Sequence, residues 1–348
     1  MNDKLIPTRD DWRSLYKAAE YFGKQKCWQW MRDTDLLVLR GQGNCETSFC
    51  AILGNNQEFF ALVIYLGWKG LAGYLRILNG ELGPYDVGML HSQRCLMASF
   101  EDKIALDDYD LKHIEDSGVN FKGPKSWPLF RSYHPGYYPW YLNKSEVVFL
   151  THALNETTKK TLLLKRDLSK KEKEKEDLTL ISFEDKRDME WVNDFLMKGF
   201  SSMGRRNYSP VNEIKAKKVK RTAKKRNVIW ETDIFYSPFP IQPNENERPY
   251  YPYIYLWVDA FSQEIIAYRL INHCDYPSVY QNSLLDLVEK LNVIPIGIHV
   301  RKKEAASILM QTSRKINVTL KVQDFLPALE SAKKGIYRYF NGPFAKKV

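Results

Sequence analysis

Apolar side chains in the first half of the chain follow two different spacings. Between residues 12 and 22 they recur every three or four positions, with Asp10 or Asp11 as the N-cap and Gly23 at the end, which predicts an amphipathic helix. Short apolar runs bounded by turn residues are typical of strands. They predict strands at 36–39, 49–53, 58–65 and 95–100, and further helices at 67–78, 109–117 and 143–164. This half is therefore expected to form an α+β domain with a small sheet.

The last third of the chain shows the most regular pattern. It predicts strands at 228–235, 250–259 and 264–271, a helix at 279–291, a strand at 294–300, a helix at 304–316, a strand at 318–322 and a helix at 326–340. The order is β-β-β-α-β-α-β-α, so we expect an α/β domain in which helices cover a mixed sheet.

A run of mixed charge at 170–177 separates these two patterns. We expect an N-terminal domain at 1–165, a charged linker at 166–178, a connecting segment with a basic helix at 179–226 and a C-terminal domain at 227–348. Between linker and basic helix, the pattern predicts a strand at 178–183 and a helix at 189–197.

Residues 127–141 are rich in aromatic side chains and proline. The prolines exclude a helix, and so many rings exclude a solvated loop, so we expect an ordered coil packed on the N-terminal domain. Two interpretations stay open. The segment is an arm that seals the core, or it binds a partner through Trp127, Arg131, His134 and Trp140.

Composition narrows the class of protein. The chain is 44% hydrophobic and 14% aromatic, which excludes disorder as its main state. The longest apolar run, 59–68, is half as long as the roughly 20 residues that a membrane-spanning helix needs. The N-terminus has no signal-peptide core, and the five cysteines are irregularly spaced. We therefore expect a cytoplasmic protein without a membrane segment.

The net charge of +10 is concentrated in one stretch. Residues 198–226 hold 11 basic side chains and one acid, Glu213. Such a patch neutralises phosphates, so the partner we expect is nucleic acid or an acidic protein. The alternative is a solvated helical face. The candidate nucleic-acid-binding residues are Lys215, Lys217, Lys218, Lys220, Arg221, Lys224, Lys225 and Arg226.

Several segments of the chain together resemble a bacterial family built from two successive domains of unknown function. The carrying segments are Trp-Gln-Trp-Met at 28–31, Tyr-Leu-Gly-Trp-Lys-Gly-Leu-Ala-Gly-Tyr at 65–74, Ser-Phe-Glu-Asp at 99–102, Trp-Pro-Leu-Phe-Arg-Ser-Tyr at 127–133, Pro-Trp-Tyr-Leu at 139–142, Trp-Glu-Thr-Asp at 230–233, Arg-Pro-Tyr-Tyr-Pro at 248–252 and Leu-Pro-Ala-Leu at 326–329. The resemblance covers nearly the full length and implies no activity.

Residues 228–340 also resemble the catalytic core of DDE integrases and transposases, which has a ribonuclease-H-like (RNase H-like) fold. The segment 229–233 is similar to that family's first strand, which carries its first acid, here Asp233. The segment 255–262 is similar to the following hairpin, and Glu330 stands where the third acid occurs. The resemblance implies an RNase H-like fold and, if the acids converge, a metal-dependent nuclease with Mg²⁺ or Mn²⁺.

The second acid of that family is missing from this chain. The strand that should end in it reads Ile-His-Val-Arg at 298–301, and Arg301 would repel a metal ion. If the protein is an enzyme, the candidate catalytic residues are Asp233, Asp259 and Glu330, with Glu231 as a further acid. Otherwise we expect no cofactor.

Other candidate sites are weaker. The six histidines and five cysteines show no zinc-ligand spacing. Asp33, Asp35, Glu101 and Asp102 end two strands, where they either meet around a cation or make local caps and ion pairs.

The resulting hypothesis is a non-enzymatic binding or adaptor protein whose basic segment contacts nucleic acid and whose RNase H-like domain is catalytically degenerate. A metal-dependent nuclease or phosphoryl-transfer enzyme and a protein–protein interaction module are the alternatives.

Overall fold

The computed structural model describes residues 6–40, 46–80, 91–168, 179–182, 210–272 and 275–341. The chain forms two compact units, Met1–Gly204 and Arg205–Val348. The segment expected to connect two domains is divided between them: a strand at 179–182 joins the sheet of the first unit, and a helix at 213–222 joins the second. The expected helix at 189–197 and most of the expected linker lie outside the described residues.

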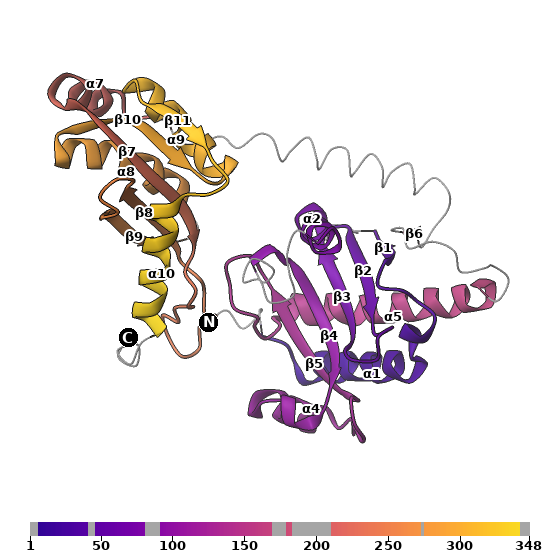
Figure 1. The fold of residues 1–348 in the computed structure, drawn as a ribbon. Helices are drawn as coiled ribbons and strands as arrows, with labels where there is room; N and C mark the ends of the chain where they lie inside the picture. Colours follow the sequence, from indigo (N-terminus) through magenta and orange to yellow (C-terminus); the bar gives the residue numbers. More distant parts are fainter. Residues whose placement is uncertain are drawn as a thin grey trace. The chain divides into compact units, whose positions relative to one another are not determined.

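The first unit is built on a six-stranded sheet with the order β5-β4-β3-β2-β1-β6 (Figure 1). All neighbouring strands are antiparallel except β1 and β6, so the sheet is mixed. The elements are α1 (Arg9–Gln25), η2 (Cys27–Gln29), β1 (Asp35–Leu39), β2 (Ser48–Leu53), β3 (Phe60–Leu66), α2 (Gly67–Leu78), β4 (Cys95–Glu101), η3 (Lys103–Ala105), α4 (Asp108–Ser117), β5 (Trp127–Tyr133), α5 (Lys144–Leu168) and β6 (Thr179–Ser182).

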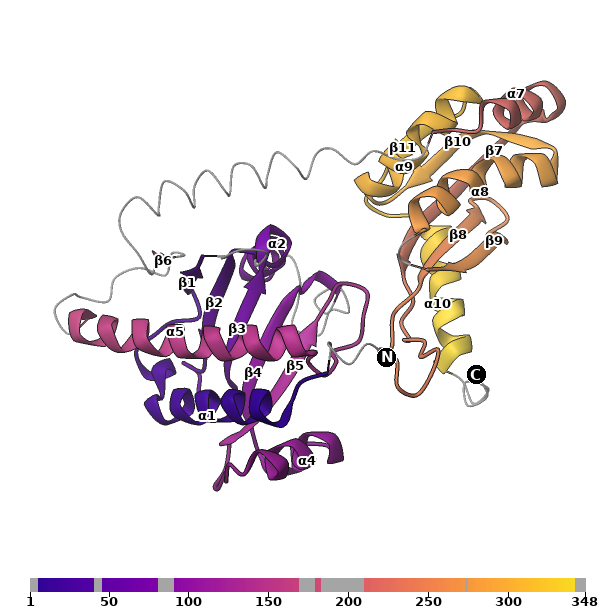
Figure 2. The same ribbon diagram turned by 180° about the vertical axis from the view of Figure 1, so that it is seen from behind.

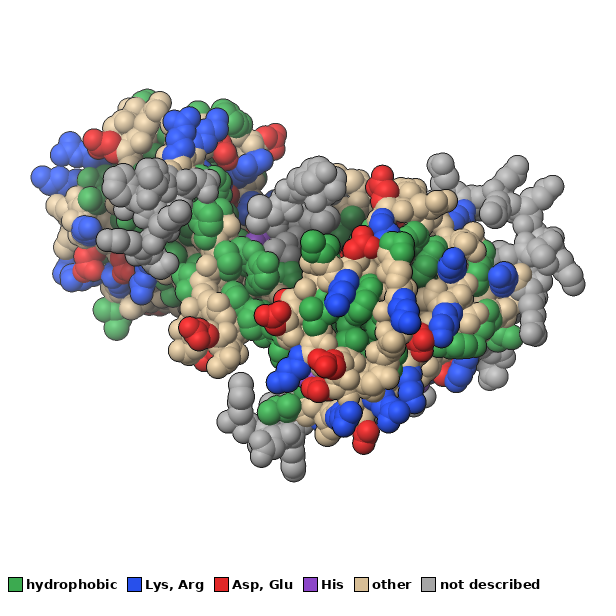
Figure 3. Space-filling model, turned by 90° about the horizontal axis from the view of Figure 1, so that it is seen from below, with side chains coloured by type: hydrophobic (Ala, Val, Ile, Leu, Met, Phe, Trp, Pro, Cys, Tyr) green, Lys and Arg blue, Asp and Glu red, His purple; other side chains and the backbone are tan. Residues whose placement is uncertain are grey.

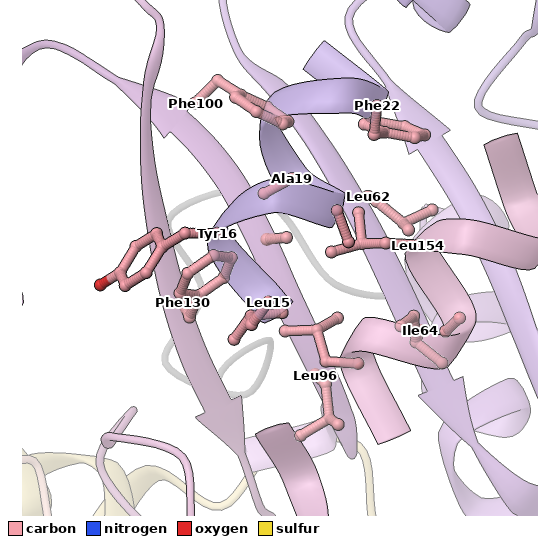
Figure 4. Close-up of a cluster of buried hydrophobic side chains, with 14 of the residues drawn as sticks. Leu15, Tyr16, Ala19, Phe22, Leu62, Ile64, Leu96, Phe100, Phe130 and Leu154 are labelled. Carbon is pink, nitrogen blue, oxygen red and sulfur yellow. The ribbon is translucent and has the colours of Figure 1, made fainter. Parts of the chain in front are cut away.

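Both faces of this sheet are covered, which is why β1 to β3 are apolar along nearly their whole length. Helices α1 and α5 lie side by side across one face (Figure 2). There, Leu15 and Phe22 of α1 pack with Leu62 of β3, Leu96 of β4 and Leu154 of α5 in the main core (Figure 4). Helix α2 covers the opposite face. The apolar faces of the helices thus pack on the apolar strands, and the first unit is the expected α+β domain.

The expected coil at 127–141 is wrong for its first half, because Trp127–Tyr133 forms the edge strand β5. Its side chains alternate between buried and half-buried, with Pro128, Phe130 and Ser132 facing inward. Proline has no N–H to donate. It is tolerated in an edge strand because such a strand forms hydrogen bonds with a neighbouring strand on one side only. The high content of rings and proline hid this alternation in the sequence.

The second unit has a five-stranded sheet with the order β11-β10-β7-β8-β9. Strands β7, β10 and β11 are parallel, whereas β8 runs antiparallel to both β7 and β9. The elements are α7 (Glu213–Thr222), β7 (Lys224–Tyr236), β8 (Tyr253–Asp259), β9 (Ile265–Ile271), α8 (Tyr276–Leu291), β10 (Val293–Val300), α9 (Lys303–Lys315), β11 (Thr319–Val322) and α10 (Pro327–Asn341). The predicted order of elements in this half is confirmed.

Helices lie on both faces of the second sheet. Side chains of α7, α8 and α9 form one core with Trp230 of β7 and Ile298 of β10. A smaller core on the other face joins α10 to Phe235 of β7 and Leu256 of β8. Because α7 inserts Ala216 and Val219 into the first of these cores, the basic helix is an integral part of the second unit.

Candidate functional site

The candidate acidic site lies where the second half of β7 faces α10. Successive side chains of a strand point to opposite faces, so Glu231, Asp233 and Phe235 share the α10 face while Trp230 and Thr232 face the other helices. All three of the α10-facing side chains are buried. Two carboxylates are therefore buried in one apolar layer, where each needs a hydrogen-bond donor or a cation as its partner.

Lys333 of α10 supplies the partner for Asp233. Its ammonium lies 3.2 Å from Asp233 Oδ2, and Asp233 Oδ1 accepts the N–H of Ile234 at 2.8 Å. Asp233 is fully buried, and the side chain of Lys333 is only 10% exposed. The same ammonium lies over the ring of Phe235, 4.4 Å from its centroid. Asp233 and Lys333 thus form a buried ion pair, which the N–H of Ile234 and the ring of Phe235 stabilise further.

Glu330 approaches the same lysine from one turn earlier in α10. Its Oε1 lies 3.7 Å from the ammonium of Lys333 and 3.1 Å from Nη1 of Arg301. Asp233 and Glu330 therefore lie on the same side of the sheet, with Lys333 between them. Arg301 binds Glu330 at the more exposed edge of this cluster, its side chain 52% exposed.

Glu231 has a different role in the same layer. Its Oε2 accepts the backbone N–H of Leu329 at 2.8 Å, so the carboxylate caps the first turn of α10. Burial raises the pKa of Glu231, and the hydrogen bonds from Leu329 and Ala328 act in the opposite direction. The carboxylate orients α10, which carries Glu330 and Lys333.

Asp259 does not join this cluster. It pairs in register with Trp230, which points to the opposite face of the sheet from Asp233. Its Oδ1 accepts the N–H groups of Phe261 and Ser262 at 2.9 and 3.0 Å, so it holds the turn between β8 and β9.

The electrostatics of this site oppose metal binding. Lys302 adds a third cation, its ammonium 2.9 Å from the carbonyl oxygen of Ile234 beside Asp233. A divalent ion between Asp233 and Glu330 would have to displace the ammonium of Lys333. In the part of the chain that the structure describes, no group of three or more His, Cys, Asp or Glu side chains is arranged to hold a metal ion.

Sequence reasoning found the acids but missed Lys333. A signal was present, because residues three apart on a helix share a face, so Lys333 points where Glu330 points. The same rule for strands, in which alternate residues share a face, indicates that Glu231 accompanies Asp233.

The second candidate site is the basic segment, in which two of the expected residues are already neutralised. Lys215 forms ion pairs with Asp286 and Glu289 of α8, and the ammonium of Lys218 lies 2.7 Å from Glu289. Hydrogen bonds from Lys218 and Lys215 lower the pKa of Glu289. These contacts fasten α7 to α8.

The other six expected cations point into solvent. They are exposed, and none forms an ion pair within the described part of the chain; they are Lys217, Lys220, Arg221, Lys224, Lys225 and Arg226. Three lie on α7 and three begin β7. In the view of Figure 3, blue Lys and Arg side chains are interspersed with red Asp and Glu side chains.

The expected partner-binding residues make contacts inside the first unit. Arg131 donates to both carboxylate oxygens of Asp110, each at 2.8 Å, and lies over the ring of Tyr141. Nε2 of His134 lies 3.5 Å from Glu146. These contacts accord with an arm that closes the unit.

The two tryptophans of this segment are held in the same way. The ammonium of Lys103 lies 5.3 Å from the ring centroid of Trp127, and the backbone N–H of Trp140 donates to the carbonyl oxygen of Ser132 at 3.0 Å. Both indole rings are half-buried.

The four acids at the strand ends do not converge. Strands β1 and β4 are separated in the sheet by β2 and β3, a distance of about 14 Å at ordinary strand spacing. Asp35 binds Arg32 at 3.2 Å, and Asp102 accepts the N–H of Lys125 at 2.9 Å. Asp35 thus forms a local ion pair, and Asp102 holds the backbone of Lys125.

Two family models match the chain in succession. Residues 12–181 match the domain of unknown function DUF7309, and residues 215–337 match the domain of unknown function DUF6930. The chain thus consists largely of two consecutive domains of unknown function. The predicted resemblance to a family of two successive domains of this kind is confirmed. Comparison with curated proteins found no match. No helix among the described residues is long and apolar enough to span a membrane.

Several solved structures are similar to part of the chain. The HTLV-2 integrase catalytic core domain in complex with magnesium is 15% identical, with a TM-score of 0.25, over 34% of this chain and 72% of that one. A simian T-cell lymphotropic virus intasome is 18% identical, with a TM-score of 0.26, over 34% and 44%. The Mos1 transposase paired-end complex with left transposon end is 10% identical, with a TM-score of 0.20, over 56% and 85%. Scores this low carry no weight, and the RNase H-like class of the second unit rests on its own element order and sheet topology.

Proposed function

We propose that this protein is a non-enzymatic binding protein that contacts the phosphate backbone of nucleic acid. The six exposed cations of α7 and the start of β7 carry this proposal. They fall within ten consecutive residues, 217–226, and none forms an ion pair with an acid in the described part of the chain. Several adjacent phosphates are the partner that such a cluster fits best, because release of their counterions drives binding.

The acidic site of the second unit has a structural role in this account. Lys333 neutralises Asp233 and Glu330, and Glu231 caps α10, so the carboxylates stabilise the packing of α10 on the sheet. The protein then needs no metal cofactor, and binding should be unchanged by a chelator. We assign it to the cytoplasm, which accords with the three buried free thiols of Cys27, Cys50 and Cys95.

The test uses the full chain, a fluorescent 20-nucleotide DNA and anisotropy at low salt. One variant replaces three cations with glutamine at the start of β7, namely Lys224, Lys225 and Arg226. A matched control removes the same charge from exposed positions elsewhere in the second unit, namely Lys303, Lys334 and Arg338. We expect the first variant to lose at least tenfold in affinity, and the control to lose much less.

Three results would contradict the proposal. Equal losses in both variants would indicate attraction by net charge alone. Equal binding of polyglutamate would point to an acidic protein as the partner. Cleavage of the DNA with Mg²⁺ or Mn²⁺, lost on Asp233→Asn, would establish the nuclease alternative.

A further inference from the structure

Phe261 is an exposed aromatic side chain at the tip of the turn between β8 and β9. It is 72% exposed. The turn itself is held firmly, because Asp259 accepts the N–H groups of both Phe261 and Ser262. A ring that projects from a fixed turn keeps its apolar face in water and loses little conformational freedom when a flat partner covers it.

The fold brings the turn that carries this ring against the first half of β7, the strand that begins with the three cations. The N–H of Ala260 donates to the carbonyl oxygen of Ile229 at 2.9 Å. Phe261 is the next residue after this contact between the turn and β7. Arg226 precedes Ile229 by three positions on the same strand. The sequence shows no aromatic residue among the cations, and only the register of β7 with β8 supplies one.

Among the described strands, none pairs with the edge of β7 next to this turn. The pairing of β7 with β8 ends at Trp230 and Asp259, whereas β7 begins at Lys224 and is paired there with β10 alone among the described strands. Residues 224–228 therefore present exposed cations along a strand with one free edge. Glu264, the nearest acid beyond the turn, aligns with Asp259 on the β9 side, away from β7.

We propose that this surface, formed by Phe261 and the cations Lys224, Lys225 and Arg226, binds single-stranded nucleic acid, with an unpaired base stacked on Phe261 and the adjoining phosphates on the cations. The inference rests on the proposed function and specifies its partner. A duplex keeps its bases stacked on one another, so the ring has no base face to meet, whereas an unpaired base offers one.

The test compares three fluorescent probes on the full chain at fixed salt: oligo(dT) of 20 nucleotides, a 20-base-pair duplex and an abasic strand of the same length. We expect Phe261→Ala to weaken oligo(dT) binding about tenfold, in line with the loss of one stacked base. Binding of the duplex and of the abasic strand should change by less than twofold. Phe261→Trp should retain the oligo(dT) affinity.

Phe325 provides the matched control. It is 67% exposed and follows β11, so it lies at the opposite end of the parallel strands from Lys224. Phe325→Ala should leave all three affinities unchanged.

The outcomes separate the two proposals. If Phe261→Ala weakens all three probes equally, the ring has a structural role and the stacking proposal is wrong. If it changes nothing while glutamine at 224, 225 and 226 abolishes binding, stacking is again wrong but phosphate binding stands. If the wild-type protein binds none of the probes, both proposals fail.

Discussion

Lys333 reaches two carboxylates from α10, one on β7 and one on its own helix. In a metal site built from carboxylates, the metal ion balances their negative charge. Here the ammonium of Lys333, which lies over the ring of Phe235, balances it. An ammonium is a single positive charge fixed to the helix, so it stabilises the docking of α10 and provides no activated water.

Removing Lys333 should therefore destabilise the second unit. Lys333→Met leaves the fully buried Asp233 without its partner, and breaking a buried pair in this way costs about 3–5 kcal/mol. Urea denaturation measures the free energy of unfolding. The double variant Asp233→Asn with Lys333→Met should recover part of the loss. A loss below about 1 kcal/mol for Lys333→Met would show that Asp233 is satisfied in another way.

Glu146 should make the stability of the first unit depend on pH. Burial raises the pKa of Glu146, but hydrogen bonds involving His134, Asn143 and Ser132 outweigh it, and the pKa lies below its ordinary value of 4.5. A lowered pKa means that the unfolded chain binds the proton more tightly. The stabilisation is therefore complete above pH 4.5 and is lost as the pH falls through the lowered pKa.

Denaturant midpoints between pH 3 and 6 measure this effect. We expect Glu146→Gln to reduce the dependence on pH in the acid range and to lower the stability at pH 6. An unchanged profile in the variant would assign the acid sensitivity to other carboxylates.

At the scale of elements, the fold was largely predictable because its helices and strands have apolar faces of the right period. Helix α2 begins and ends at the predicted residues, and the capping box at Asn143 and Glu146 opens α5. Strand β5 was missed because its alternation is carried by proline, phenylalanine and serine. The pairing of Lys333 with Asp233 depends on two elements a hundred residues apart, which no local pattern reports.

Helix α2 also explains three glycines of the Tyr65–Tyr74 segment. Gly67, Gly70 and Gly73 share one face of the helix, and a Cβ atom on Gly70 would lie 2.6 Å from the carbonyl oxygen of Arg94. The helix thus approaches the backbone that leads into β4 more closely than any side chain permits.

Gly70→Ala should destabilise the first unit by about 1–3 kcal/mol, since the backbone must move to admit a methyl group. The matched control is Gly335→Ala in α10, where a Cβ atom meets nothing within 4 Å. There the better helix propensity of alanine should add up to about 1 kcal/mol. Thermal unfolding of both variants measures the difference, and a neutral Gly70→Ala would contradict the close approach.

At the scale of the whole molecule, the positive charge is unevenly distributed. The net charge of +10 equals the excess of 11 basic residues over one acid within 198–226. The described part of this stretch holds six exposed cations that form no ion pair there, while Lys215 and Lys218 fasten α7 to α8. The proposed contact with a polyanion is thus assigned to α7 and the start of β7 in the second unit.

The dependence of affinity on salt tests this account most directly. If six cations each neutralise one phosphate of a single strand, the logarithm of the binding constant should fall with the logarithm of salt concentration at a slope of about −4. Glutamine at 224, 225 and 226 should make the slope shallower by about 2, and the control at 303, 334 and 338 should leave it unchanged. A slope near zero, or one that the first variant does not alter, would contradict phosphate binding by the start of β7.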